Sequence, residues 1–276
     1  MPGFELIGKE EYKEIQDLFE NSGILFRHGF DAMRNDIYKV RDFEKKFSKK
    51  LGIADSLAVS SGTAALKVAL EAIGVGRGDE VITQAFTFVA TVESIVEVGA
   101  KPVIANIDET LNINPQDLEA KITDKTKAVI VVHMLGIPSD MSSVMKIAKK
   151  HNLKVIEDTA WGCGGTYGDQ YLGTIGDLGT FSFDFAKTIT TGEGGMVVAK
   201  DPLILEAAKA YHDHGHENNP SLPRWEDSRS RSGFNYRMTE MQGAVGIAQL
   251  DKLDQIIASH QNNKQAINKK IKDLPI

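Results

Sequence analysis

The chain has 276 residues, of which 42% are hydrophobic and 25% are charged, and its formal net charge is −6. This length is enough for one sizeable α/β domain and leaves room for a second, smaller one. Because nucleic acids and membrane surfaces attract clustered lysine and arginine, the acidic balance argues against both as partners, although a locally positive pocket can still bind an anionic small molecule.

The cellular location is predicted from three features. Cys163 is the only cysteine, so an internal disulfide is impossible and a reducing compartment is expected. The N-terminal sequence lacks the basic stretch and apolar run of a signal peptide. No apolar run approaches the roughly 20 residues that cross a bilayer. We therefore expect a soluble, cytoplasmic protein.

The first half of the chain alternates between strand and helix patterns. An amphipathic helix is expected at 9–20, and the stretch 23–35 is irregular and rich in aromatic and basic residues. Short β-rich runs follow at 57–59, 80–83, 102–106, 127–132 and 153–157. Helical patterns lie between them, at 66–74, 89–98 and 142–150. This alternation predicts βαβ units and a mostly parallel central sheet flanked by helices.

After Asp158 the pattern changes. Glycines crowd into a loop-rich stretch at 162–176. Two β-rich runs at 178–183 and 195–199, a helix at 202–210, a polar loop at 213–232 and a long helix from Thr239 then follow. The chain stops at 273–276, where an apolar strand is expected to begin.

Two small polar motifs precede helix starts. Residues 60–65 (Ser-Ser-Gly-Thr-Ala-Ala) combine backbone amides with hydroxyl groups, which together can bind an anion. Residues 233–238 (Gly-Phe-Asn-Tyr-Arg-Met) offer an amide and a guanidinium group, which suit phosphate or oxyanion ligands. Each motif can also be an ordinary capped helix start, so both interpretations stay open.

Two further motifs carry charged side chains. The apolar run at 155–158 ends in Glu157 and Asp158, where one carboxylate could hold a protonated ring nitrogen or merely cap a turn. Lys187 leaves an aromatic-flanked strand and is followed by a glycine-rich loop at 190–195. Burial there would lower the lysine pKa and favour a nucleophilic amine, whereas a solvated loop lysine would have no such role.

Together these motifs resemble the DegT/DnrJ/EryC1/StrS aminotransferases, which use pyridoxal 5′-phosphate (PLP) to aminate keto-sugars. The resemblance covers most of the chain in the family's order. It runs through Ser-Gly-Thr-Ala-Ala-Leu (61–66), Gly-Asp-Glu-Val-Ile (78–82), Phe-Thr-Phe-Val-Ala-Thr (86–91), Ile-Glu-Asp (156–158), Ser-Phe (182–183), Lys187 with Thr-Gly-Glu-Gly-Gly (191–195), and Asn-Tyr-Arg-Met-Thr-Glu (235–240).

The resemblance implies the PLP-dependent transferase fold, with PLP as cofactor and no metal. Lys187 would form the Schiff base with PLP and move the proton during transfer, while Asp158 would pair with the pyridinium nitrogen. Phe88 would stack on the ring. The phosphate would be held by Gly62, Thr63 and Ala64 together with Ser182.

The resemblance also implies a homodimer with shared active sites, because Asn235 would reach the phosphate in the neighbouring subunit. An amino acid, commonly glutamate, would donate the amine and a keto-sugar would accept it. The implied division is an N-terminal arm and helix at 1–35, a large PLP-binding domain at 36–240, and a helix at 241–276 that leads toward a small domain largely absent from this chain.

Two features set the chain apart within the family. Trp161 stands where the family usually has the glutamine that contacts the cofactor's phenolic oxygen. The N-terminal residues 1–6, 26–36 and 41–42 look like the branch that aminates C8 of an octulosonate sugar acid (the Kdo8N transaminases). Arg27, His28 and Arg34 are then candidates to bind the acid's carboxylate, unless they are solvated or paired internally.

Two other functions are compatible with the motifs. A PLP-dependent sugar dehydratase would share the fold, although some dehydratases replace the lysine by histidine, and Lys187 therefore favours transamination. A regulator that kept the fold and lost catalysis is the second alternative, favoured by the missing C-terminal part.

Overall fold

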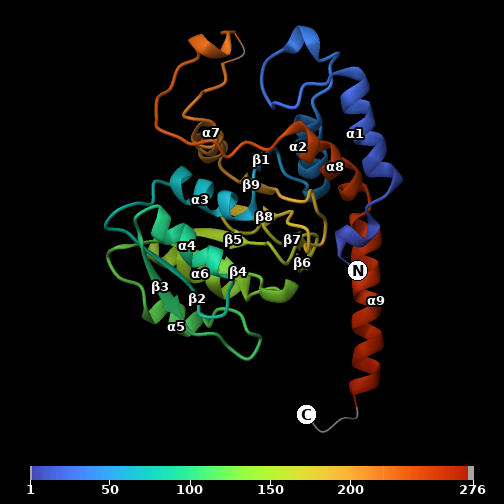
Figure 1. Ribbon diagram of the computed structural model, residues 1–276. Helices are drawn as coiled ribbons and strands as arrows, with labels where there is room; N and C mark the ends of the chain where they lie inside the picture. The colour runs from blue at the N-terminus through green and yellow to red at the C-terminus, as the bar shows by residue number, and fades with distance from the viewer. Residues whose placement is uncertain (1, 220, 273–276) are drawn as a thin grey trace.

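The computed structural model describes residues 2–219 and 221–272, and over these residues the strands form one seven-stranded sheet and one two-stranded sheet (Figure 1). The large sheet has the order β1-β9-β8-β5-β4-β2-β3. Its strands are β1 (Ser56–Val59), β2 (Glu80–Gln84), β3 (Lys101–Ala105), β4 (Thr126–Val132), β5 (Lys154–Asp158), β8 (Leu178–Ser182) and β9 (Gly195–Ala199). The small sheet pairs β6 (Thr166–Tyr167) with β7 (Gln170–Tyr171).

The centre of the large sheet is parallel. Strands β3, β2, β4, β5 and β8 pair in parallel, whereas β9 runs antiparallel to both β8 and β1. The predicted mostly parallel sheet is therefore confirmed. Side chains of the buried strand β4 alternate between two layers, with Ile130 packing into one core and Val129 and Val131 into another.

Helices cover both faces of this sheet (Figure 1). They are α1 (Lys9–Asn21), α2 (Lys39–Leu51), α3 (Gly62–Ala72), α4 (Val89–Glu97), α5 (Pro115–Ala120), α6 (Met141–His151), α7 (Pro202–Tyr211), α8 (Glu240–Asp251) and α9 (Leu253–Ile271). Helices α3, α4 and α7 share the core of one face. On the other face α2 and α8 cover β1, β9 and β8, and α5 and α6 cover β2, β4 and β5.

Short 3₁₀ segments lie at Gly3–Leu6, Asp31–Met33, Met134–Gly136 and Arg224–Glu226. Among the described helices, none is both long enough and apolar enough to pass through a bilayer.

The strand predictions for the large sheet match the structure closely, but the short strands β6 and β7 and two helices were not predicted. Helix α2 buries Val40, Phe43, Phe47 and Leu51 at helical spacing, so its signal was present in the sequence. Helix α5 has six residues, too few for a periodic pattern to be recognised, and is set by Asn114 as N-cap with proline in the first turn.

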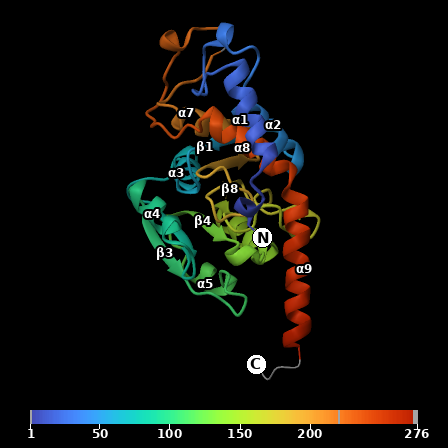
Figure 2. The same cartoon turned by 45° about the vertical axis from the view of Figure 1, so that its right-hand side comes forward.

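The long helix expected from Thr239 is divided at Lys252 into α8 and α9, so its prediction as one helix was wrong. Lys252 donates hydrogen bonds to the Leu6 carbonyl and to the Glu11 carboxylate, which ties the break to the N-terminal segment. Helix α8 packs between α1 and α2, whereas residues 260–271 of α9 are exposed. The far half of α9 stands apart from the rest of the described fold (Figures 1 and 2). The strand expected at 273–276 lies outside the described residues.

Candidate active site

A pocket of about 220 Å³ opens at the carboxyl ends of β5 and β8, the edge at which parallel sheets bind ligands. The N-termini of α3 and α4 form part of its wall. The predicted site residues that line it are Gly62, Thr63, Phe88, Asp158, Trp161, Ser182 and Lys187. These residues come from four separate segments of the chain, which thus meet at one place.

Two neighbouring acids at the end of β5 have different environments. Glu157 accepts hydrogen bonds from the amides of Gly173, Ile175 and Gly176 and lies 2.9 Å from Nε2 of His133, so its carboxylate is fully used by the fold. Asp158 lines the pocket. Of these two acids, Asp158 is the one that lines the pocket, and its role toward a cofactor stays a prediction.

The Asp158 carboxylate is buried and only partly satisfied. The Thr91 hydroxyl donates to Oδ2 at 2.9 Å and the Ala160 amide to Oδ1 at 3.2 Å. Burial raises the pKa of Asp158, and these two hydrogen bonds oppose the rise without cancelling it. A cationic hydrogen-bond donor placed in the pocket, such as a protonated pyridine nitrogen, would satisfy this carboxylate.

Lys187 is half-buried on the same pocket. Burial lowers the pKa of its amine, while the charges of Asp184 and Asp158 oppose that change. The Lys187 Nζ lies 3.8 Å from the centroid of the Trp161 ring. The segment that carries it is fixed by backbone hydrogen bonds from the Lys187 amide to Asp184 and from the Gly3 amide to the Lys187 carbonyl.

The N-terminus of α3 forms the anion-binding end of the pocket. A Cβ on Gly62 would lie 2.6 Å from the Ser182 Cβ, so only glycine lets the helix start this close to the end of β8. Thr63 and Ser182 line the pocket beside it. The Ala64 amide instead donates to Oγ of Ser61, the N-cap residue, and Ala64 lies outside this pocket.

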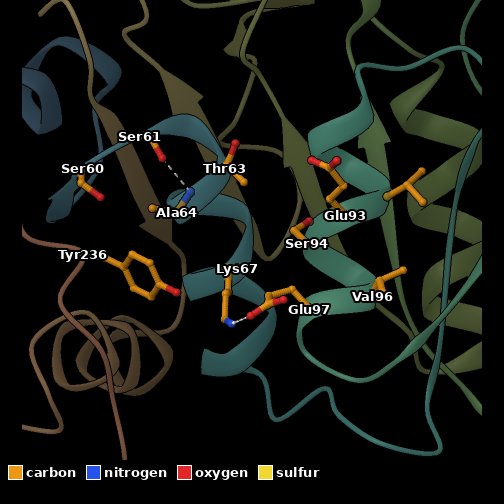
Figure 3. A pocket seen from close by; sticks show the side chains of 11 residues that line it. Ser60, Ser61, Thr63, Ala64, Lys67, Glu93, Ser94, Val96, Glu97 and Tyr236 are labelled. Atoms are coloured by element: carbon orange, nitrogen blue, oxygen red, sulfur yellow. Dashed lines mark hydrogen bonds and ion pairs between the residues drawn. The ribbon is translucent and has the colours of Figure 1, made fainter.

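A second pocket, of about 600 Å³, lies beside the first between α3 and α4 (Figure 3). Ser61 and Thr63 line both pockets. In Figure 3, Lys67 from α3 points toward Glu97 of α4, with Nζ and Oε1 3.0 Å apart. Tyr236 closes the opposite side. Sequence analysis did not single out Lys67 or Glu97, because only the packing of α3 on α4 brings them together.

Asn235 does not line the first pocket of its own chain. It is exposed, and its side-chain oxygen accepts a hydrogen bond from the Arg237 amide at 3.3 Å. Its predicted contact with a neighbouring subunit's phosphate stays a prediction.

The basic residues of the N-terminal arm are paired internally. Arg27 is buried and donates to Glu44 at 2.6 Å and to the Ala58 carbonyl at 2.9 Å. Arg34 is fully buried and donates to Glu240 at 3.3 Å and to the Gly29 carbonyl at 2.6 Å. Of the two alternatives left open, internal pairing therefore accounts for both arginines, because these contacts use both guanidinium groups inside the fold.

His28, the third candidate, does not carry a positive charge at neutral pH. Burial, followed by the charge of Arg27, lowers the pKa of its ring to about 3. Its Nε2 lies 3.2 Å from the Asp213 carboxylate. His28 therefore offers no positive charge to a substrate carboxylate, and its Nε2 makes no hydrogen bond among the described residues.

A half-buried lysine, a buried aspartate and a helix N-terminus around one pocket, at the edge of a mostly parallel sheet, define the PLP-dependent transferase class of fold. The chain belongs to the DegT/DnrJ/EryC1/StrS aminotransferase family, whose model matches residues 31–276.

Similar proteins support this assignment. GDP-perosamine synthase of Escherichia coli O157:H7 is 41% identical over 236 residues, which cover 85% of this chain and 64% of that protein. The aminotransferase from Psychrobacter cryohalolentis has a TM-score of 0.88 and 36% identity, over 96% of this chain and 67% of that structure. Spr1654 from Streptococcus pneumoniae, solved in a PLP form, has a TM-score of 0.86 and 27% identity over 97% of this chain and 70% of that structure.

The chain is shorter than these relatives. It spans 64% and 58% of the length of two GDP-perosamine synthases, from Escherichia coli and Caulobacter vibrioides.

Proposed function

We propose that this chain is the cofactor-binding part of a PLP-dependent aminotransferase that moves an amino group from an amino acid, with glutamate the default donor, to a keto-sugar or keto-sugar acid. The observation that carries the proposal is that Lys187 and Asp158 line the same pocket. The division into an arm at 1–35, a cofactor-binding domain at 36–240 and a leading helix at 241–276 belongs to this proposal. So does a role in the cytoplasm, in the synthesis of cell-surface sugars such as lipopolysaccharide.

The residues of the pocket fit PLP at both of its ends. The partly satisfied carboxylate of Asp158 suits a protonated ring nitrogen, and the start of α3 with Ser182 suits the phosphate. Phe88 and Trp161 offer aromatic faces between these two ends. When bound, PLP supplies an electron-withdrawing ring that stabilises negative charge on the substrate carbon.

Lys187 has the properties that amine chemistry needs. Because burial lowers its pKa, a larger fraction of the amine is neutral and nucleophilic near neutral pH than for a solvated lysine. The same amine can afterwards accept and return a proton at the substrate carbon. Asp158, anchored by Thr91 and Ala160, keeps its carboxylate in place during these steps.

We also propose a homodimer in which Asn235 acts in the partner's site. Asn235 is exposed on its own chain, and apolar side chains are exposed around the two pockets, with Phe88 62%, Val96 58% and Phe234 55% exposed. Exposed apolar surface of this kind is typical of an interface. A second copy of the chain would cover it and complete the site.

Absorbance spectroscopy tests the enzymatic proposal. Protein mixed with PLP should turn yellow, and glutamate should bleach the colour as the amino group is transferred. A colour that responds to no amino acid would instead indicate a dehydratase or a catalytically inactive regulator. A protein that stays colourless and fails to retain PLP would contradict all three functions. Lys187→Ala should fold normally and show no turnover.

The shared site has its own test. Lys187→Ala and Asn235→Ala are each expected to be inactive alone. If Asn235 acts in the partner's site, mixed dimers contain one intact site, and the refolded mixture should recover about a quarter of the wild-type activity. A mixture as inactive as its components would contradict the shared site.

A further inference from the structure

Trp161 is placed against Lys187 by a tight turn. The turn starts directly after Asp158, and the Gly162 amide donates to the Thr159 carbonyl at 3.0 Å. Gly136, at a φ of 77°, packs against it, and a Cβ there would stand 3.0 Å from the Trp161 carbonyl oxygen. The backbone of Trp161 is therefore fixed on both sides, and its ring is 37% exposed at the wall of the pocket.

The indole ring is the direct contact of the lysine amine. Among residues 2–219 and 221–272, the Lys187 Nζ has no hydrogen bond or ion pair, and it lies 3.8 Å from the Trp161 ring centroid. This distance is well within the range in which an ammonium group binds the face of an aromatic ring. The other ionisable side chains of the pocket are Asp158, Asp184 and Glu193.

We propose that Trp161 is a positioning residue for Lys187, whose ammonium group it holds against its indole face, inside the pocket and beside Asp158, before the cofactor binds. A glutamine at this position has no such face. The inference deepens the proposed function, since it concerns the same lysine, but the contact exists in the protein without PLP.

The contact has two consequences for cofactor loading. It keeps the flexible lysine side chain in the pocket, so the amine does not have to be recruited from solvent. It also stabilises the charged form, which must release its proton to solvent before the nitrogen can bond to the aldehyde carbon and the aldehyde oxygen can leave as water. Removing the ring should therefore favour the neutral amine and at the same time leave it less well placed.

Tryptophan fluorescence can read this contact without any cofactor. The chain has two tryptophans, and Trp225→Phe leaves Trp161 as the only one. Trp225 is 83% exposed and lies away from the pocket, so this background should fold normally. The emission of Trp161 should change in one step as Lys187 loses its proton on raising the pH. Adding the matched neutral variant Lys187→Met should abolish that step.

Kinetics of PLP loading provide the second readout. The rate at which visible absorbance grows after mixing with PLP should follow the neutral fraction of Lys187. In Trp161→Gln the acid dissociation constant of Lys187 should rise roughly two- to thirty-fold, which moves the inflection to lower pH. Trp161→Phe, which keeps a weaker aromatic face, should fall between Trp161→Gln and the parent.

The outcomes separate this inference from the proposed function. An emission that is independent of pH, or that changes equally with Lys187→Met, would overturn the role of Trp161. An unchanged inflection in Trp161→Gln would also overturn it. A lysine-dependent emission step in a protein that fails to bind PLP would support the contact and contradict the proposed function instead.

Discussion

Two buried aspartates in this molecule have opposite surroundings. Asp158 accepts one hydroxyl and one amide hydrogen bond, and burial raises its pKa. Burial would also raise the pKa of Asp213, but hydrogen bonds from Arg224 and the surrounding positive charges hold that pKa below its usual value. Arg224 donates to both Asp213 oxygens, at 2.5 and 2.7 Å, and Arg237 donates at 2.7 Å.

The difference shows which carboxylate is free to do chemistry. The ion pairs of Asp213 hold the 213–232 loop to the segment that carries Arg237, so the role of this carboxylate is structural. The fold buries Asp158 and supplies it with neutral donors, which carries a cost in stability that a bound cation would offset. An incompletely satisfied buried acid on a pocket is a feature of a functional site.

The largest expected effect is on activity, from Asp158→Asn. The amide keeps the size of the side chain but cannot stabilise a positive ring nitrogen, so activity should fall by about 10²- to 10⁴-fold. The variant removes a buried charge that burial disfavours and that forms no ion pair among the described residues, although the Lys187 charge acts on it from a distance, so its stability should be close to or above that of the parent. Steady-state kinetics and urea unfolding on one preparation check both halves. A variant that fails to fold, or one that keeps the parental activity, would contradict the distinction between a functional Asp158 and a structural Asp213.

Asp213→Asn should have the reverse effect and lower stability. It leaves the guanidinium groups of Arg224 and Arg237, both partly buried, without their acid, and breaking a buried pair in this way costs about 3–5 kcal/mol. Urea unfolding should show the loss. Glu217→Gln, at an exposed acid of the same loop, is the matched control and should change the unfolding free energy far less than Asp213→Asn does.

The next effect is a dependence of stability on pH. Burial lowers the pKa of His28 to about 3 and also lowers the pKa of His212. Below about pH 6.5 the unfolded chain therefore binds protons that the folded chain excludes, and stability falls as the pH falls toward 3. Each histidine contributes a slope of about 1.4 kcal/mol per pH unit in that window.

The variant His28→Asn tests this dependence, because it cannot be protonated. Unfolding free energies measured between about pH 7 and pH 4.5 should fall less steeply for the variant. The two slopes should differ by about 1.4 kcal/mol per pH unit, the contribution of one proton. Parallel slopes for the two proteins would mean that His28 is not held neutral by the fold.

Sequence reasoning found the sheet and the pocket because their signals are local. Apolar runs define the strands. The rule that ligands bind at the carboxyl ends of parallel strands made Asp158 a candidate, and the family resemblance gave it its expected role. The aromatic run that precedes Lys187 indicated that this lysine is buried, which made it the second candidate residue. These features need only a few neighbouring residues to be recognised.

The errors concern contacts between distant residues. Arg34 pairs with Glu240, 206 positions away, and a basic residue with no visible partner resembles a ligand when only the sequence is known. Lys252, at the break between α8 and α9, pairs with Glu11 at the other end of the chain. The contact of Trp161 with Lys187 was also beyond prediction, because two turns have to fold before the ring faces the amine.

The smallest expected effect sharpens the description of Asp158 itself. Thr91→Val keeps the shape of the side chain and removes the hydroxyl that donates to Oδ2, one of the two protein hydrogen bonds of this carboxylate among the described residues. The pKa of Asp158, already raised by burial, should rise further, so its ionised form is lost at a higher pH. Activity near neutral pH should fall by at most roughly ten- to hundred-fold, since a hydrogen bond to a charged group contributes about 1.5–3 kcal/mol.

The pH profile of kcat/KM checks this, because its acid limb should move to higher pH in Thr91→Val. Thr87→Val is the matched control, since the Thr87 hydroxyl contacts that of Thr91 at 2.8 Å and not the carboxylate. It should shift the acid limb less than Thr91→Val does. Equal shifts in the two variants would indicate that the two threonines act on Asp158 only as a pair. An unshifted acid limb in Thr91→Val would mean that the ionisation of Asp158 does not depend on this hydroxyl.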